Sequence, residues 1–273
     1  RYTEEAVKFI RDHTNQPFFL YLPHTAVHGP LFPGKAFQGR SQDGAYGDWV
    51  EEVDWSTGQI LDSIKRAGLD EQTLVVFTTD NGSAREKQGS NLPLRGRKGR
   101  TDEGGMRVPC IARWPGRIPA GRRCSEVAAT IDLLPTFAKL AGTIPPTDRI
   151  IDGKDIWPLL AGNVGAASPH ESYFYYQMDQ LQAVRSGPWK LFVAMDAKKR
   201  NWGKPEGPTE QKLFNLADDI HEDHNIANQH PEIVKLLLAM AKEAREDLGD
   251  AGSPGQNQRP AGWVEVGVPL LKN

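Results

Sequence analysis

The sequence predicts an α/β domain followed by a small α+β subdomain, and three observations lead to this prediction. First, helical and strand-like patterns alternate along the first half of the chain, which is typical of α/β proteins. Second, Thr73–Thr79 is a nearly continuous apolar and β-branched run, as in strands of a sheet that is covered on both faces. Third, short strand-like runs follow one another closely after residue 163, which is typical of a small antiparallel sheet.

The α/β part is predicted from two helices and three strands. Apolar residues at helical spacing predict a helix over Tyr2–His13 and a longer one over Tyr46–Gly68, where the glycine is the stop signal. Phe18–Leu22 is an uninterrupted apolar run that predicts a buried strand, and Pro109–Trp114 is another run of this kind. Together with the strand at Thr73–Thr79, these elements make up an open α/β sheet with helices packed against it.

The composition changes near residue 163, where Gly, Ala, Asn and Ser dominate, and we place a domain boundary there. Before it, a helix is expected over Asp132–Ala141, with Asp132 as its N-cap and Gly142 at its C-terminus. The expected units are residues 1–163, a subdomain at 164–250, and an irregular tail at 251–273. The elements expected in the subdomain are strands at Ser172–Tyr176, Leu181–Arg185 and Trp189–Ala194 and a helix at Pro231–Gly249.

The composition is that of an ordinary globular chain of 273 residues, with 25% charged and 38% hydrophobic residues. A formal net charge of -2 gives no overall attraction to nucleic acid, so no nucleic-acid partner is expected. No apolar run approaches the roughly 20 residues of a membrane span. Cys110 and Cys124 form no CxxC or Cys/His pattern, which favours two separate thiols. Because position 1 is Arg, we expect the chain to begin inside a larger product.

Asp80 and Asn81 follow directly on the strand predicted at Thr73–Thr79. Open α/β sheets form their ligand crevice at the carboxyl ends of the strands. A carboxylate beside an amide oxygen suits a hard cation such as Ca²⁺ or Mg²⁺ better than zinc or copper. The alternative is a simple turn that ends the strand, since Asn-Gly is a common turn dipeptide.

Two histidines, His24 and His28, follow the other predicted buried strand, at Phe18–Leu22. They could therefore face the same crevice as Asp80. A histidine can donate a proton to a leaving oxygen near neutral pH, as the hydrolysis of an ester with a poor leaving group requires. The alternative is that both are loop histidines satisfied by backbone groups or water.

The stretch between residues 85 and 107 is locally basic. Beside a divalent cation, such a loop could hold the oxygens of a sulfate or phosphate group, with lysine acting as a point charge and arginine as a fork. The alternative is a solvated basic loop. The Glu-Gly-Gly at residues 103–105 predicts a tight turn that brings backbone close to a neighbour. The basic residues are Arg85, Lys87, Arg95, Arg97, Lys98, Arg100 and Arg107.

Three segments, taken in order, resemble the later active-site motifs of the formylglycine-dependent (type I) sulfatases of the alkaline phosphatase superfamily. They are residues 26–30 (Ala-Val-His-Gly-Pro), 79–82 (Thr-Asp-Asn-Gly) and 96–105 (Gly-Arg-Lys-Gly-Arg-Thr-Asp-Glu-Gly-Gly). The resemblance, which is of the arylsulfatase kind, continues through residues 45–58, 132–136, 152–153 and 183–191. It implies part of an alkaline-phosphatase-like mixed sheet sandwiched by helices, with the C-terminal α+β subdomain attached.

The resemblance also implies roles for individual residues. Asp80 and Asn81 would be two of four protein ligands of a Ca²⁺ ion, with Mg²⁺ as the second choice. Lys98 and His28 would contact the sulfate and assist departure of the leaving group. His24, with the arginines near Lys98 (Arg95 and Arg97), are candidates for substrate contacts. The substrate would be a sulfate ester, with sulfated carbohydrates among the candidates.

The family's nucleophile motif, C/S-x-P-x-R, does not occur around either cysteine of this chain. The paired aspartates, the lysine and the histidine that accompany the nucleophile would also lie upstream. We therefore expect a C-terminal portion that is inactive alone and becomes a sulfatase when the missing part completes it. Isolated, it should expose apolar faces and aggregate.

Two alternatives stay open at this point. One is a phosphodiesterase or phosphonate ester hydrolase of the same superfamily, against which the sulfatase-like segment at residues 98–105 argues. The other is a noncatalytic relative that binds sulfated glycans, which is disfavoured because Asp80, Asn81, Lys98 and His28 occur together. By resemblance alone, the compartment would be periplasmic, lysosomal or secreted.

Overall fold

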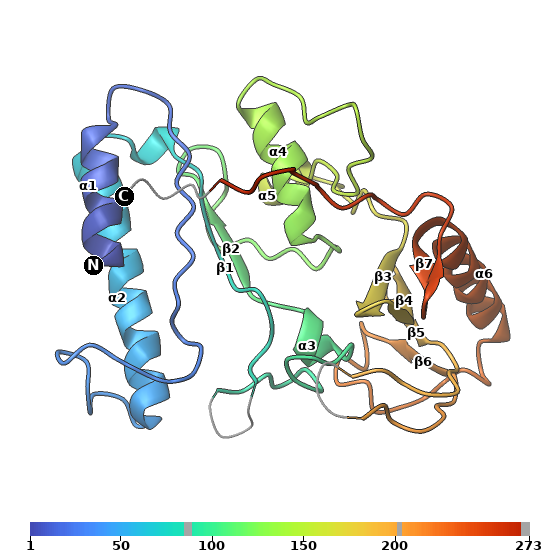
Figure 1. Cartoon of the computed structure of the whole chain (residues 1–273). Helices are drawn as coiled ribbons and strands as arrows, with labels where there is room; N and C mark the ends of the chain where they lie inside the picture. Colours follow the sequence, from blue (N-terminus) through green and yellow to red (C-terminus); the bar gives the residue numbers. More distant parts are fainter. Residues whose placement is uncertain (85–88, 201–203, 269–273) are drawn as a thin grey trace.

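The structure is a computed structural model, and it describes residues 1–84, 89–200 and 204–268. The first half of the chain holds helices around a small pair of strands, and the second half holds a four-stranded sheet with a long helix (Figure 1). Helix α3 and the loops around it lie between the two halves in this view. The mixture of helices and strands confirms the predicted α/β class.

Two helices, α1 (Tyr2–Asp12) and α2 (Gly44–Arg66), pack against each other and confirm the first two predicted helices. Their contact buries small and aliphatic side chains such as Ile10, which is fully buried, and Ile64. The hydroxyls of Thr3 and Ser56 also meet across the helices at 2.8 Å. A short 3-10 helix, η1 (Asp70–Gln72), leads from α2 into the first strand.

The first sheet is smaller and more open than predicted. Strands β1 (Val75–Thr78) and β2 (Cys110–Arg113) pair antiparallel, and the sheet contains only these two strands within the described residues. The prediction that β1 is covered on both faces is wrong, since Phe77 is 39% exposed and Ile111 on β2 is 62% exposed. Two strands alone cannot cover their own faces.

The prediction of a buried strand at Phe18–Leu22 is also wrong. This segment has no strand assignment in the structure, and Phe19 and Tyr21 are 71% and 75% exposed. A strand exists only where a neighbouring strand satisfies its backbone hydrogen bonds. None of the strands in the described ranges pairs with residues 18–22, so the apolar run stays extended and uncovered.

Helix α4 (Leu133–Leu140) confirms the helix predicted at Asp132–Ala141, and it is preceded by a 3-10 turn, η2 (Thr130–Asp132). Asp132 is the N-cap, and its carboxylate is buried. The carboxylate accepts hydrogen bonds from the backbone amides of Ala129 and Lys154 at 2.7 and 2.8 Å, and His170 Nε2 lies 2.8 Å from it. Helix α5 (Trp157–Leu160) follows. Because no helix or strand lies between Leu160 and Tyr173, the predicted boundary at 163 falls in irregular chain, and it stays a prediction.

The second sheet has the order β3-β4-β5-β6, with every pair antiparallel. Helix α6 (Pro231–Leu248) covers one face of it, and their contact forms the main apolar core with Leu181, Leu191 and Leu237 fully buried. The strands are β3 (Tyr173–Gln177), β4 (Gln180–Ser186), β5 (Trp189–Phe192) and β6 (Lys212–Asn215). The first three and α6 were predicted, whereas β6 was not.

The end of the chain returns to both parts of the molecule. A small pair of strands, β7 (Gly249–Asp250) and β8 (Ser253–Pro254), follows α6, and β8 lies within the tail that we expected to be irregular. Arg259 then forms an ion pair with Asp152 at 2.6 Å and another with Asp247 at 3.3 Å. Over the part of the chain that the structure describes, no helix combines the length and apolar character needed to cross a membrane.

Candidate active site

Asp80 and Asn81 lie just beyond β1, as the sequence predicts for a ligand crevice. The Asp80 carboxylate is exposed and accepts a hydrogen bond from the Asn81 amide and a long one, 3.4 Å, from Thr79 Oγ1. Within the described ranges, no lysine or arginine forms an ion pair with it. The strand therefore delivers an exposed carboxylate that pairs with no cationic side chain of the described ranges.

The backbone after Asn81 joins this carboxylate loop to the loop that carries Lys98. The Lys98 amide donates a hydrogen bond to Ser83 O at 3.1 Å. The Asn91 side chain strengthens the connection, because its Oδ1 accepts from Ser83 N at 2.7 Å and its Nδ2 donates to Ser83 O and Gly96 O at 3.2 and 3.0 Å. Asn91 was not among the predicted site residues.

Glycine at residues 82, 104 and 105 permits this close approach. A Cβ on Gly82 would lie 1.8 Å from Gly104 O, and one on Gly105 would lie 2.2 Å from Arg100 O. Side chains cannot occupy such positions, so the loops pack backbone against backbone. The turn predicted at residues 103–105 is the start of a short helix, α3 (Glu103–Met106). Its prediction as a close backbone approach is confirmed.

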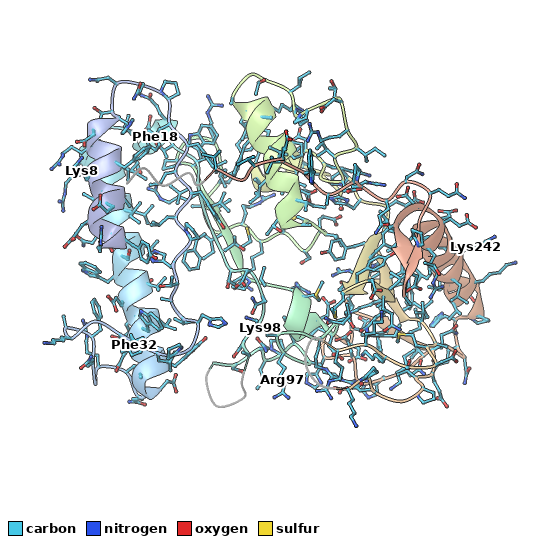
Figure 2. The ribbon with its side chains drawn as sticks, in the orientation of Figure 1. Lys8, Phe18, Phe32, Arg97, Lys98 and Lys242 are labelled. Carbon is cyan, nitrogen blue, oxygen red and sulfur yellow. The ribbon has the colours of Figure 1, made fainter. Side chains whose placement is uncertain are left out.

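The structure divides the basic stretch into paired and unpaired groups. Arg100 pairs with Asp102 at 2.9 Å and Arg107 lies 4.0 Å from Glu103, so both serve the fold. Arg97 is exposed and Lys98 is half-buried, and neither forms an ion pair in the described ranges. Figure 2 shows both on the loop that precedes α3. Arg85 and Lys87 lie outside the described residues.

Arg95, predicted as a substrate contact, is 41% exposed, and its guanidinium is engaged with other parts of the chain. Its Nη1 donates to Glu222 O at 2.7 Å, and its Nε lies 3.7 Å from Asp102 Oδ1. Glu222 belongs to the C-terminal subdomain, 127 residues away in sequence. This placement gives Arg95 a role in joining the two parts of the chain.

The two histidines lie on an irregular segment between α1 and α2. His24 packs edge-on against Tyr2 with ring centroids 5.9 Å apart, and burial lowers the pKa of its imidazole against an opposing effect of Glu52. His28 is exposed, and its Nδ1 lies 2.8 Å from Gly29 O. A carbonyl only accepts, so Nδ1 carries a proton and Nε2 is the atom open to a ligand. In the described chain, no hydrogen bond or ion pair links this segment to the loops of Asp80 and Lys98.

Behind the Lys98 loop lies a buried charge cluster that sequence reasoning missed. Lys190 on β5 is fully buried and contacts Glu103 Oε1 and Glu222 Oε1, each at 2.9 Å. Tyr175 donates to the same Glu103 oxygen at 2.9 Å, and Arg185 lies 3.5 Å from the other. A lysine at an inward position of an otherwise apolar strand is the sequence signal that could have found it.

The two buried carboxyl groups respond differently to this environment. Burial opposes ionisation of Glu103, yet Lys190 and Arg185 outweigh it and hold the pKa of this carboxyl below its usual value. At Glu222, burial dominates and raises the pKa, although Lys190 acts against it. Glu103 is therefore the principal partner of the Lys190 charge.

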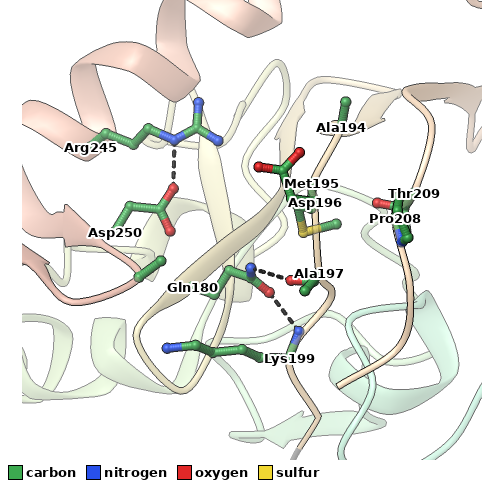
Figure 3. A pocket seen from close by; sticks show the side chains of 11 residues that line it. Gln180, Ala194, Met195, Asp196, Ala197, Lys199, Pro208, Thr209, Arg245 and Asp250 are labelled. Atoms are coloured by element: carbon green, nitrogen blue, oxygen red, sulfur yellow. Dashed lines mark hydrogen bonds and ion pairs between the residues drawn. The ribbon is translucent and has the colours of Figure 1, made fainter. Parts of the chain in front are cut away.

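A cavity of about 550 Å³ lies elsewhere, in the C-terminal subdomain (Figure 3). Several of its polar groups are engaged with each other: Arg245 pairs with Asp250 at 2.6 Å, and Gln180 bonds to Ala197 O and Lys199 N. None of the predicted site residues lines it. Both cysteines are free and exposed, which confirms the prediction of two separate thiols.

The fold is of the mixed α/β class, and comparison with known proteins gives the family. A family model described as "Sulfatase" matches residues 1–143, and one described as "C-terminal region of aryl-sulfatase" matches residues 168–266. The chain therefore belongs to the sulfatase family.

Its relatives are longer than this chain. Human steryl-sulfatase is 46% identical over 206 residues, which are 70% of this chain and 35% of that protein. N-acetylgalactosamine-6-sulfatase of the dog, Canis lupus familiaris, is 45% identical over 195 residues, 69% of this chain and 37% of that protein. The solved PsFucS1 sulfatase from Pseudoalteromonas sp. superposes with a TM-score of 0.78 at 28% identity, covering 89% of this chain and 52% of that one. The chain thus spans about a third of these curated relatives and half of the solved structure.

Proposed function

We propose that this chain supplies the C-terminal part of the active site of a sulfuric ester hydrolase, which releases sulfate and an alcohol. The observation that carries the proposal is the hydrogen bond from Lys98 N to Ser83 O. It joins Lys98 to the loop of Asp80, two residues that form no ion pair within the described ranges, in a chain of the sulfatase family. An anion bound between a cation and Lys98 would meet positive charge from both sides.

Calcium fits the donor atoms that the structure presents. Asp80 and Asn81 offer a carboxylate and an amide oxygen, which are hard ligands, and Asp80 has no competing cationic side chain in the described ranges. For both residues to bind one cation, the Asn81 amide must present Oδ1 instead of the Nδ2 that now faces Asp80. A bound Ca²⁺ would withdraw charge from the sulfate oxygens.

Lys98 and His28 are proposed to act on the leaving group. The Lys98 ammonium stabilises negative charge as it develops on the bridging oxygen. In its imidazolium form His28 carries protons on both nitrogens, and Nε2 donates its proton to that oxygen as the bond to sulfur breaks, which leaves a neutral alcohol and a neutral imidazole. The Gly29 carbonyl supports this role, because it accepts the Nδ1 proton and thereby orients the imidazole. His24, Arg95 and Arg97 are proposed substrate contacts, and Arg95 also supports the loop through its bond to Glu222 O.

The nucleophile is proposed to come from the preceding region of the family domain, because the C/S-x-P-x-R motif is absent from these 273 residues. We call this chain joined to that region the extended polypeptide. Its substrate is proposed to be a sulfate ester, with sulfated carbohydrates favoured by one relative's name, N-acetylgalactosamine-6-sulfatase. A solved relative at 30% identity, described in complex with a neocarrahexaose, also supports this choice. A periplasmic, lysosomal or secreted location belongs to the same proposal.

The test is sulfate release by the extended polypeptide from an aryl sulfate and from sulfated sugars, with a phosphodiester and a phosphonate ester as competing substrates. We expect the extended polypeptide to hydrolyse sulfate esters. Chelation of Ca²⁺ should abolish this hydrolysis, and added Ca²⁺ should restore it. Lys98→Ala should lower kcat about 100-fold or more, as does removal of other transition-state charge donors. Arg117→Ala, in the loop after β2, is the control and should leave kcat unchanged. Cleavage of the phosphorus esters alone would establish the phosphodiesterase alternative instead, and inactivity on every ester would favour the noncatalytic one.

A further inference from the structure

Lys190 joins the C-terminal sheet to the loop that carries Lys98. Besides Glu103 and Glu222, its Nζ donates to Thr101 O at 2.8 Å and lies 4.1 Å from the centre of the Tyr175 ring. The contacts thus reach from β5 to residues that follow Lys98 by three and five positions. Thr101 is itself fully buried, and its hydroxyl donates to Gln182 at 2.8 Å.

Glu222 holds the same loop at two points. Its Oε2 accepts from Glu103 N at 2.8 Å, at the start of α3, and its backbone carbonyl accepts from Arg95 at 2.7 Å. Lys190 and Glu222 therefore fix both flanks of residues 95–103. Lys98 lies between the two anchored flanks, with its own ammonium unpaired in the described ranges.

Burying an ion pair at this position is costly compared with an apolar pair of the same shape. The sheet gains its core from other residues, such as Leu191 and Leu213, which are fully buried beside the cluster. The charge cluster adds instead a fixed position for the loop, because its hydrogen bonds are directional and cross between the two parts of the chain.

We propose that Lys190 and Glu222 are positioning residues for Lys98: they hold the loop of residues 95–103 so that the Lys98 ammonium meets the leaving-group oxygen. This inference rests on the proposed function. A displacement of about 1 Å at a catalytic group can lower a rate about 100-fold. Since Lys98 acts on charge that develops in the transition state, the loss should appear in kcat more than in KM.

The test uses three variants of the extended polypeptide. Lys190→Met alone leaves Glu103 and Glu222 without their shared cation, so it should lower the melting temperature. Lys190→Met combined with Glu222→Gln removes one positive and one negative charge, while glutamine still provides an acceptor for Glu103 N. This double variant should recover part of the melting temperature, because Glu103 then keeps Arg185, 3.5 Å away, as its cationic partner. Lys212→Met, at an exposed lysine of β6, is the matched control and should change neither property.

We expect the double variant to keep a kcat about 100-fold below that of the unsubstituted protein, with KM changed less than about threefold. In a Lys98→Ala background, the same double substitution should lower kcat by less than about threefold, because residues that act as a unit are not additive. Recovery of kcat together with the melting temperature would overturn the proposal. An undiminished 100-fold loss in the Lys98→Ala background would overturn it as well.

Amide hydrogen exchange separates this inference from the proposed activity. In the double variant, exchange of residues 96–101 should be at least tenfold faster, while exchange in the centre of α6 should be unchanged. Unchanged exchange at residues 96–101 would contradict the positioning role even in an active enzyme. If the unsubstituted protein hydrolyses no sulfate ester, the proposed function fails, and faster exchange would still show that Lys190 and Glu222 hold the loop.

Discussion

The Asn91 side chain holds Ser83 by both of its backbone groups, accepting from Ser83 N at 2.7 Å and donating to Ser83 O at 3.2 Å. The second amide proton goes to Gly96 O at 3.0 Å. One side chain thereby joins the segment after Asp80 and Asn81 to the loop of Lys98. The distance between the proposed metal ligands, Asp80 and Asn81, and the proposed catalytic Lys98 therefore depends on the Asn91 amide.

Replacing Asn91 should weaken both the fold and the proposed catalysis. Asn91→Ala removes three hydrogen bonds and should lower the free energy of unfolding of the extended polypeptide by about 2 kcal/mol. Asn91→Asp keeps the acceptor for Ser83 N but loses both donors, so its free energy of unfolding should lie between those of Asn91→Ala and the unsubstituted protein. Urea unfolding measures the effect, and Ser90→Ala, next to it on the surface, is the control. Equal stability of Asn91→Ala and the unsubstituted protein would show that the loops are held by other contacts.

Gly82 and Gly58 form a matched pair for testing the close backbone approach. Gly82→Ala places a Cβ 1.8 Å from Gly104 O, so the two loops must separate, at a cost of about 2 to 3 kcal/mol. Gly58 lies inside α2 with nothing within 4 Å of the added atom, and Gly58→Ala should stabilise by about 0.5 to 1 kcal/mol. Thermal unfolding of both variants gives the comparison. A neutral Gly82→Ala would mean that the loops are not in contact in solution.

The sequence predicted the helices α1, α2, α4 and α6 and the strand β1, because these follow from local periodicity. It failed at Phe18–Leu22 and at the two covered faces of β1, because pairing and covering depend on residues distant in sequence. For the same reason, sequence alone could not predict the contact of Arg95 with Glu222. Its partner Glu222 is 127 positions away, and only the folded chain brings the two together.

Asp48 gives a prediction about pH. Its buried carboxylate accepts backbone hydrogen bonds from Ser41, Gly39 and Arg40, and these hold its pKa below the usual value. A depressed pKa in the folded state means that the stabilisation is present above the ordinary value near 3.8 and is lost as the pH falls through the lower folded value.

Asp48→Asn should therefore reduce the urea midpoint at pH 7, and the difference from the unsubstituted protein should shrink as the pH falls below about 4. Asparagine also directs an amide group at Gly39 N, where an acceptor is needed. Asp43→Asn, at an exposed neighbouring position, should show no such difference. A difference between Asp48→Asn and the unsubstituted protein that stays constant from pH 7 to pH 3 would exclude the carboxylate as its source.

Exposed apolar side chains on strand β2 and on the extended segment of residues 18–22 predict how this chain behaves by itself. Phe19, Tyr21 and Ile111 are each more than 60% exposed, and the strands β1 and β2 have no further partners in the described ranges. Uncovered apolar faces and open strand edges promote association between molecules. The 273-residue chain should therefore self-associate in a concentration-dependent way, which light scattering detects.

Ile111→Lys combined with Phe19→Ser should raise the concentration at which scattering begins, because both changes remove apolar surface from that face. Val164→Lys is the control, since Val164 is fully exposed in the irregular segment before β3, and it should have no comparable effect. In the extended polypeptide, the same Ile111→Lys and Phe19→Ser changes should instead destabilise the fold, since we propose that the preceding region covers this face. A monomeric, sharply melting 273-residue chain would contradict the argument, because it would show that the exposed face needs no cover.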